Sequence, residues 1–190
     1  MPNEMLQRVV VIGAPGTGKS QLAERLAAAL RVPFVEMDAL YWKPGWVDSP
    51  AEEFSARLAE ATARDRWVVA GNYTHAGGRD IWPRADCVVW IDLPLRITLP
   101  RLLLRSWRRW RTRELLWGTN IERFWPQLRL WDAKTSLLSF SVRTHATRRR
   151  NNLEAMRDPA FASRFLRLTT PREVEEFARG IEAGAGAPGS

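Results

Sequence analysis

The chain has 190 residues, 45% of them hydrophobic and 26% charged, which is typical of one globular domain and excludes a disordered or collagen-like chain. Lys and Arg outnumber Asp and Glu by 29 to 21, so the formal net charge is +8. A single cysteine excludes an intrachain disulfide, and without a signal peptide or an apolar run of about 20 residues we expect a cytoplasmic protein with no membrane partner.

The first predicted elements surround a glycine-rich turn. The β-branched run Arg8–Ile12 predicts a strand buried on both faces, and a helix follows in which Leu22, Leu26 and Leu30 recur at helical spacing. A second strand is predicted over residues 33–38.

Helices and strands then alternate along the chain. Capping-box patterns at Ser49–Glu52 and Thr170–Glu173 predict two helix starts. Further strands are predicted over residues 67–70, 87–91 and 164–168, with Cys87 in the core. The alternation predicts a doubly wound α/β sheet with ligands at the carboxyl ends of its strands.

The segment 13–20 matches the P-loop pattern G-x-x-x-x-G-K-S between a predicted strand and a predicted helix. Its glycines let successive backbone N–H groups face phosphate oxygens, and the helix N-terminus adds partial positive charge. We expect Lys19 to reach the β- and γ-phosphates of ATP or GTP, and the Ser20 hydroxyl to bind Mg²⁺. The predicted nucleotide-binding residues are Gly13, Ala14, Pro15, Gly16, Thr17, Gly18, Lys19 and Ser20.

Asp38 follows the second strand and has three interpretations: binding Mg²⁺ through water, accepting a proton from a substrate hydroxyl, or capping a turn. The aromatic loop after it, with Trp42 and Trp46, either walls an acceptor pocket or closes one end of the core.

The third strand ends in Ala70, where many P-loop enzymes carry Asp, so metal binding shifts to Asp38 or catalysis is weakened. His75, in the next loop, is interpreted as solvated. The predicted acceptor-binding residues are Asp38, Trp42, Asn72, Tyr73 and Arg79.

Residues 95–110 predict an amphipathic basic helix, bent at its start by Pro100. Its arginines form either a solvated face or a lid over the transferring phosphoryl group, and we favour a lid over about 108–135 because they follow the fourth strand. Arg105 and Arg109 then act in catalysis with Lys19 and Asp38. The basic surface, which includes residues 148–150, also fits nucleic acid.

Several segments together resemble the adenylate-kinase-like family often labelled DNA topology modulation proteins, within the wider group of nucleoside monophosphate, shikimate and gluconate kinases. The resemblance covers residues 8–157 and implies a five-stranded kinase fold with a lid, ATP and Mg²⁺. It departs at Ala70, where relatives usually carry an acidic residue; Glu36 and Asp38 look like the acidic pair of the shikimate kinases. The matching segments are 13–20, 38–46, 71–73 with Arg79, 85–86, and 113–117 with Asn120 and Glu122.

The leading hypothesis is one P-loop kinase-like domain over residues 1–183, with a flexible tail over 184–190. It transfers the γ-phosphoryl group of ATP to a small acceptor, with a nucleoside monophosphate as one candidate. The alternatives are nucleotide-dependent nucleic-acid binding and a slow NTPase switch. We prefer the kinase because no helix-turn-helix, zinc finger or stacking motif accompanies the charge.

Overall fold

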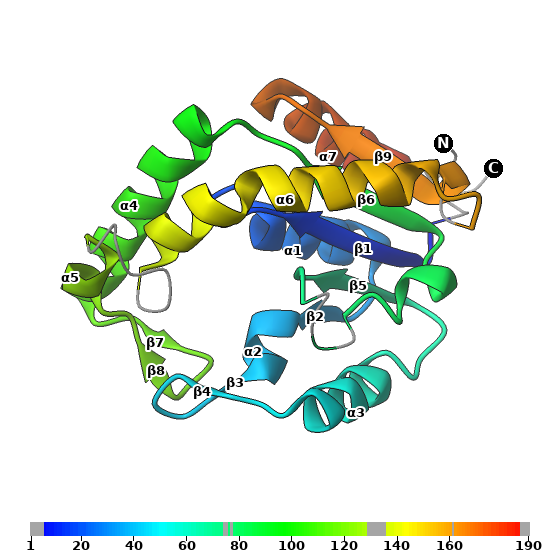
Figure 1. The fold of residues 1–190 in the computed structure, drawn as a ribbon. Helices are drawn as coiled ribbons and strands as arrows, with labels where there is room; N and C mark the ends of the chain where they lie inside the picture. Colours follow the sequence, from blue (N-terminus) through cyan, green and yellow to red (C-terminus); the bar gives the residue numbers. More distant parts are fainter. Residues whose placement is uncertain (1–5, 74–75, 77, 129–135, 161, 187–190) are drawn as a thin grey trace.

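A computed structural model describes residues 6–73, 76, 78–128, 136–160 and 162–186. Its centre is a five-stranded parallel sheet in the order β2-β5-β1-β6-β9, so the fold is the predicted doubly wound α/β sheet of a P-loop protein (Figure 1). The apolar runs form strands because a strand covered on both faces needs continuous β-branched side chains. The bounds are β1 Arg8–Gly13, β2 Phe34–Glu36, β5 Trp67–Ala70, β6 Cys87–Ile91 and β9 Phe165–Leu168.

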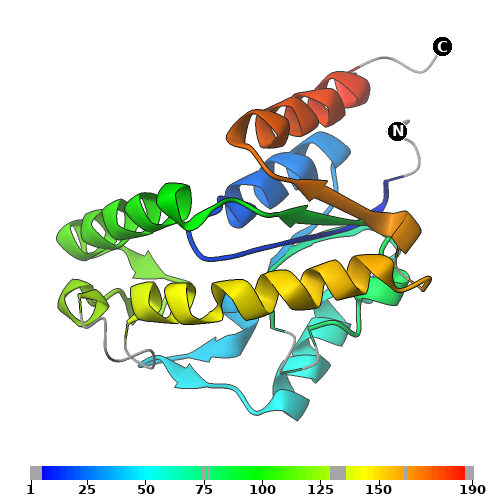
Figure 2. The ribbon, with the colours of Figure 1, turned by 45° about the horizontal axis from the view of Figure 1, so that its top comes forward.

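Helices cover both faces of the sheet. One face carries α1 (Lys19–Leu30) and α7 (Pro171–Gly186), and the other carries α3 (Ala51–Ala61) and α6 (Leu137–Arg157), as Figure 2 shows from a second side. Short 3-10 helices at Trp82–Arg84 and Ala162–Arg164 precede β6 and β9. No helix among the described residues combines the length and the apolar character needed to cross a bilayer.

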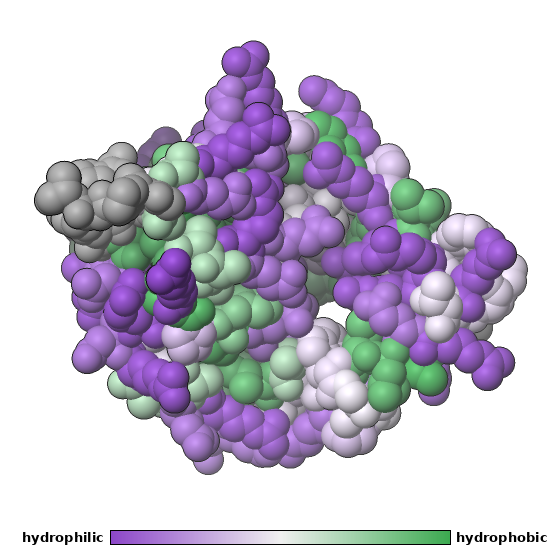
Figure 3. All heavy atoms as spheres, turned by 180° about the vertical axis from the view of Figure 1, so that it is seen from behind, coloured by the Kyte–Doolittle hydropathy of each residue, from purple (hydrophilic) through white to green (hydrophobic). Residues whose placement is uncertain are grey.

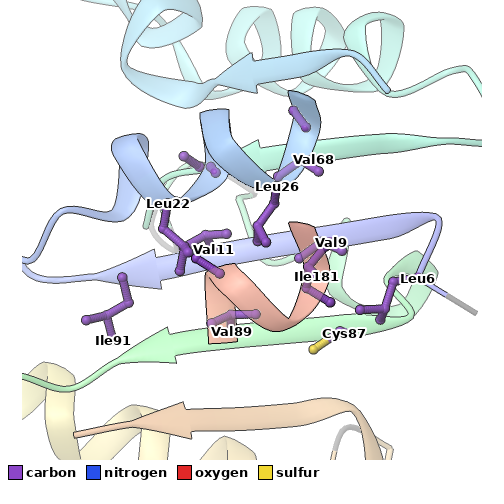
Figure 4. Packing of buried hydrophobic residues seen from close by; sticks show 14 of the residues in the cluster. Leu6, Val9, Val11, Leu22, Leu26, Val68, Cys87, Val89, Ile91 and Ile181 are labelled. Atoms are coloured by element: carbon purple, nitrogen blue, oxygen red, sulfur yellow. The ribbon is translucent and has the colours of Figure 1, made fainter. Parts of the chain in front are cut away.

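The two faces of β1 lie in separate apolar cores. Val9 and Val11 pack under α1 and α7, where Leu22, Leu26 and Ile181 point onto the sheet (Figure 4). Val10 and Ile12 face the opposite core with Phe54 and Leu58 of α3. Cys87 lies in the first core, as predicted, and burial raises the pKa of its thiol to about 11. This packing holds the carboxyl ends of β1, β2 and β5 at one edge, where the P-loop begins.

Smaller elements project beyond that edge on the α4 side of the molecule (Figure 1). After β2 comes the short helix α2 (Met37–Tyr41), then a hairpin of β3 (Trp42–Lys43) and β4 (Val47–Asp48). After β6 comes the long helix α4 (Leu95–Thr112), then a second hairpin of β7 (Leu115–Leu116) and β8 (Asn120–Ile121), and the short helix α5 (Phe124–Gln127).

Three sequence predictions differ from the structure at element ends. The second strand ends at Glu36, so Asp38 lies in the first turn of α2 and not in a strand. The helix after Ser49 forms, but the Ser49 hydroxyl lies 3.5 Å from the Leu40 carbonyl oxygen and makes no capping hydrogen bond. The last helix continues through Gly186, beyond the predicted start of the tail at Gly184, and residues 187–190 lie outside the described part.

The Thr170 cap is made as predicted, since its hydroxyl accepts a hydrogen bond from the Glu173 N–H at 3.1 Å. The basic helix also forms as predicted and includes Pro100.

By contrast, the 21-residue helix α6 was not predicted. Its N-cap is Ser136, whose hydroxyl accepts from the Ser139 N–H at 3.2 Å. It has a low apolar periodicity because small polar residues, including Ser139 and Ser141, make much of its buried side.

Candidate active site

The P-loop joins β1 to α1 with backbone conformations that favour glycine. Gly16 and Gly18 have φ of 83° and 89°, in the left-handed region. A Cβ on Gly16 would lie 2.4 Å from the Thr98 carbonyl oxygen, so the loop packs directly against α4. Gly18 has no side chain that could cap α1, which leaves the first N–H groups of the helix to an anion. The local geometry therefore suits a phosphate.

A carboxylate lies directly beside the Ser20 hydroxyl. Ser20 Oγ donates to Glu36 Oε1 at 2.8 Å, and Glu36 Oε2 accepts from the indole N–H of Trp117 at 2.8 Å. Glu36 is the last residue of β2 and pairs in register with Ala70 of β5. The acid that is missing at Ala70 is thus present one strand over, at the same level of the sheet.

Asp38 and Tyr73 form a second polar pair at this edge. The Tyr73 hydroxyl donates to Asp38 Oδ1 at 2.5 Å. Burial raises the pKa of Tyr73, and the Asp38 charge raises it further, so the phenol stays protonated and donating. Gly71, with φ of 152°, permits this arrangement because a Cβ there would lie 2.4 Å from the Cβ of Met37.

Lys19 is half-buried and interacts electrostatically with these two carboxylates and with two arginines. Burial lowers the pKa of Lys19; Asp38 and Glu36 raise it, while Arg105 and Arg148 lower it. Burial also lowers the pKa of Arg105, on α4, and its Nε is buried without a hydrogen-bond partner among the described residues. The cluster therefore gathers cations that a phosphate chain would neutralise.

Arg148, on α6, interacts electrostatically with the same cluster. Burial lowers its pKa, while Tyr73 and Asp38 raise it. Its guanidinium lies 4.7 Å from the centre of the Phe140 ring. Sequence reasoning treated this residue only as part of a basic surface, because nothing in residues 148–150 indicates which of the three arginines faces inward.

Trp42 and Asn72, two of the predicted acceptor residues, lie in different surroundings. Trp42 hydrogen-bonds Tyr73 and so lies with the Asp38 pair. Asn72 lines a small cavity with Ala14 and Arg148, and its buried Oδ1 has no hydrogen-bond partner among the described residues.

Arg79 contacts Trp82 and helix α6. Its guanidinium lies 4.7 Å from the Trp82 ring centre and donates to the Asn151 carbonyl of α6 at 3.3 Å. His75 and the end of the predicted lid, residues 129–135, lie outside the described residues.

Arg109 lies one helical turn beyond Arg105 and pairs with carboxylates of the following segment. Its guanidinium lies 3.4 Å from Glu114 and 3.7 Å from Glu122, measured between nearest charged atoms. Glu122 is buried and also accepts from the Ser106 hydroxyl. These contacts fasten the β7–β8 hairpin to α4.

Asn120 joins the two hairpins. Its side-chain oxygen accepts from the Trp46 backbone N–H at 2.9 Å, and its amide donates to the Lys43 carbonyl at 3.1 Å. The rings of Trp46 and Trp117 meet edge to face with centres 5.7 Å apart. The aromatic loop therefore contacts the hairpin whose Trp117 reaches Glu36.

Comparisons with known proteins bear on the fold. Residues 9–92 match the family described as ATPase family associated with various cellular activities (AAA). The fold is similar to a gluconokinase from Sinorhizobium meliloti 1021, with TM-score 0.55 and 21% identity over 95% of this chain and 92% of that one. It is also similar to a shikimate kinase from Bacteroides thetaiotaomicron, with TM-score 0.51 and 16% identity over 94% and 97%. No curated protein matches the chain.

These similarities show an α/β fold of the P-loop type. The family match extends from β1 to the residue after β6 and includes the P-loop, Glu36 and Asp38. The resemblance to the DNA topology modulation proteins is more specific than these findings and stays a prediction.

Proposed function

We propose that this protein is a kinase that transfers the γ-phosphoryl group of ATP to a hydroxyl of a small acceptor. The observation that carries the proposal is that half-buried Lys19 interacts with two carboxylates that have different partners. Glu36 contacts the Ser20 hydroxyl of the P-loop, whereas Asp38 contacts the hydroxyl of Tyr73, which lies outside the P-loop segment. Both carboxylates raise the pKa of Lys19. One carboxylate is therefore available to the donor side and the other to the acceptor side.

On the donor side, the backbone N–H groups of 13–20 and the Lys19 ammonium bind the phosphates. The Ser20 hydroxyl and the Glu36 carboxylate fit Mg²⁺, because both are hard oxygen ligands and lie 2.8 Å apart. When bound with ATP, Mg²⁺ would neutralise charge on the phosphate oxygens. Trp117 must release Glu36 if both carboxylate oxygens are needed there.

On the acceptor side, Asp38 accepts the proton of the acceptor hydroxyl as that oxygen bonds to the γ-phosphorus and the bond to the β-phosphate oxygen breaks. Tyr73 orients the carboxylate. Arg105 and Arg148 offset the charge that spreads over the transferred group. Trp42 and Asn72 would contact the acceptor. The contacts of Arg109 with Glu114 and Glu122 support a positioning role in the lid.

The test is an ADP-release assay over a panel of sugar acids and other hydroxy acids, with nucleoside monophosphates included as acceptors that take the phosphoryl group on a phosphate oxygen. We expect release that depends on one acceptor class, lost in Lys19→Ala and reduced at least about 100-fold in Asp38→Asn, whose ATP binding persists. Arg172→Ala is the control, because this side chain is exposed on the outer side of α7. ADP release at the same rate with and without every acceptor, unaffected by Asp38→Asn, would contradict the proposal.

A further inference from the structure

The outer side of α4 exposes large apolar side chains among its arginines. Thr98, Leu102 and Ser106 are buried against the protein, and Arg105 lies in the active-site cluster. On the opposite side, Leu104 is 64% exposed and Trp107 is 40% exposed. A helix that only packs on a sheet buries its apolar side chains and exposes its charges. The exposed Leu104 and Trp107 depart from this pattern, which indicates that the outer side meets something other than water.

The exposed apolar surface continues beyond α4. Trp110 of α4, Leu115 of β7 and Ile121 of β8 are exposed, and Trp125 of α5 is 64% exposed. In Figure 3 this side of the molecule lies at the right, where apolar and near-neutral atoms interrupt the hydrophilic surface. Most of the exposed large apolar residues among the described part therefore gather on one connected segment.

The same surface is strongly basic. Helix α4 contains six arginines and neither Asp nor Glu between Leu95 and Thr112. Arg101, Arg108 and Arg111 are exposed on the outer side, and no salt bridge of the described residues involves them. The Arg111 guanidinium lies 5.4 Å from the Trp107 ring centre. Cations and tryptophans thus alternate on this side.

The charge discriminates between occupants. A second copy meeting this face about a two-fold axis would bring the same arginines together, and like charges repel. An anionic bilayer surface complements both parts, because arginines bind its headgroups while Trp and Leu side chains enter the headgroup and acyl boundary. We propose that the outer face of α4 (Arg101, Leu104, Trp107, Arg108, Trp110 and Arg111) binds the surface of an anionic lipid bilayer.

Co-sedimentation of the full chain with vesicles tests this inference. We expect binding to phosphatidylcholine vesicles that contain phosphatidylglycerol, weak binding to phosphatidylcholine alone, and a fall in binding with salt. Arg108→Ala with Arg111→Ala should lower binding about 10- to 30-fold, since each basic residue adds roughly a fivefold factor at an anionic surface. Leu104→Ser with Trp107→Ser should lower binding at every salt concentration.

Matched controls keep the outcome clear. Arg172→Ala with Arg179→Ala removes two exposed cations from α7, and Val142→Ser removes an exposed apolar side chain from α6; both should bind like the wild type. Equal binding to both vesicle types, or wild-type binding by the Arg108 and Arg111 variant, would overturn the proposal. So would a dimer in light scattering that Leu104→Ser makes monomeric while vesicle binding is absent.

Discussion

Glu36 is the carboxylate that we propose binds Mg²⁺ together with Ser20. Its carboxylate contacts Ser20 and lies opposite Ala70 in the sheet register. Glu36→Gln should lower activity about 10- to 100-fold and raise the Mg²⁺ concentration needed for half-maximal rate. The reason is that a neutral amide replaces the carboxylate at the metal site and lowers metal affinity. Kinetics over a Mg²⁺ titration measure both effects.

Adding Ala70→Asp to Glu36→Gln should restore part of the activity, since it places a carboxylate at the same level on the neighbouring strand. Glu176→Gln on α7 is the control. If Glu36→Gln leaves the Mg²⁺ dependence unchanged, the assignment of Glu36 to the metal is wrong.

Gly71 makes a conformational contribution that can be tested at the same scale. Gly71→Ala should destabilise the fold by about 1–3 kcal/mol, because the residue has φ of 152° and the new Cβ would overlap Met37. Denaturant unfolding measures the loss. Gly45→Ala shares a positive φ but has open space around it, so its cost should be smaller. Equal costs would mean that the contact with Met37 is unimportant.

At the scale of elements, Asn120 fastens the β7–β8 hairpin to the aromatic loop. The side chain is 1% exposed and bonds Trp46 and Lys43 backbone atoms. Asn120→Ala should cost about 1–3 kcal/mol, because two buried backbone groups lose their partner. Amide exchange at Trp46 should accelerate.

Asn120→Asp is the informative comparison, since it keeps the oxygen that Trp46 needs but loses the donor to Lys43. It should protect the Trp46 amide better than alanine does. Identical exchange in both variants would refute the hairpin contact.

Helices α1 and α7 are joined by an ion pair that depends on pH. Arg25 donates to Glu175 at 2.7 Å, and the hydrogen bonds from Arg25 and Arg179 lower the pKa of Glu175 to about 2 from an ordinary 4.5. A carboxyl whose pKa is lower in the folded state stabilises the fold above its unfolded pKa and loses this contribution as pH falls.

The melting temperature of Glu175→Gln should therefore lie below that of the wild type at neutral pH, and the gap should narrow between pH 4.5 and about 2. The effect is small because the pair is solvent-exposed. Glu154→Gln on α6 is the control, and a gap that is constant with pH would contradict the pairing.

At the scale of the whole molecule, the apolar patterns predicted the central sheet well. Residues 67–70 and 87–91 form strands with the predicted bounds, because uninterrupted apolar runs suit a sheet covered on both faces. The P-loop was equally clear, since its glycines and its place between strand and helix are local features.

What the sequence concealed depends on contacts between distant residues. The Ser20–Glu36 bond requires the register of β2 with β5, and the place of Arg148 requires α6 to cross the sheet. Asp38 was assigned to a strand because nothing local indicates the turn into α2. The Ser49 capping box does not form because Ser49 donates hydrogen bonds to the backbone carbonyls of Tyr41 and Leu40 instead.

The most direct test of phosphoryl transfer uses ATP labelled in its γ-phosphoryl group together with a metabolite extract. Mass spectrometry then identifies the labelled products. We expect a labelled small hydroxyl compound with the wild type and none with Asp38→Asn, although that variant still binds ATP. Label found only in inorganic phosphate, in equal amounts with both proteins, would contradict it.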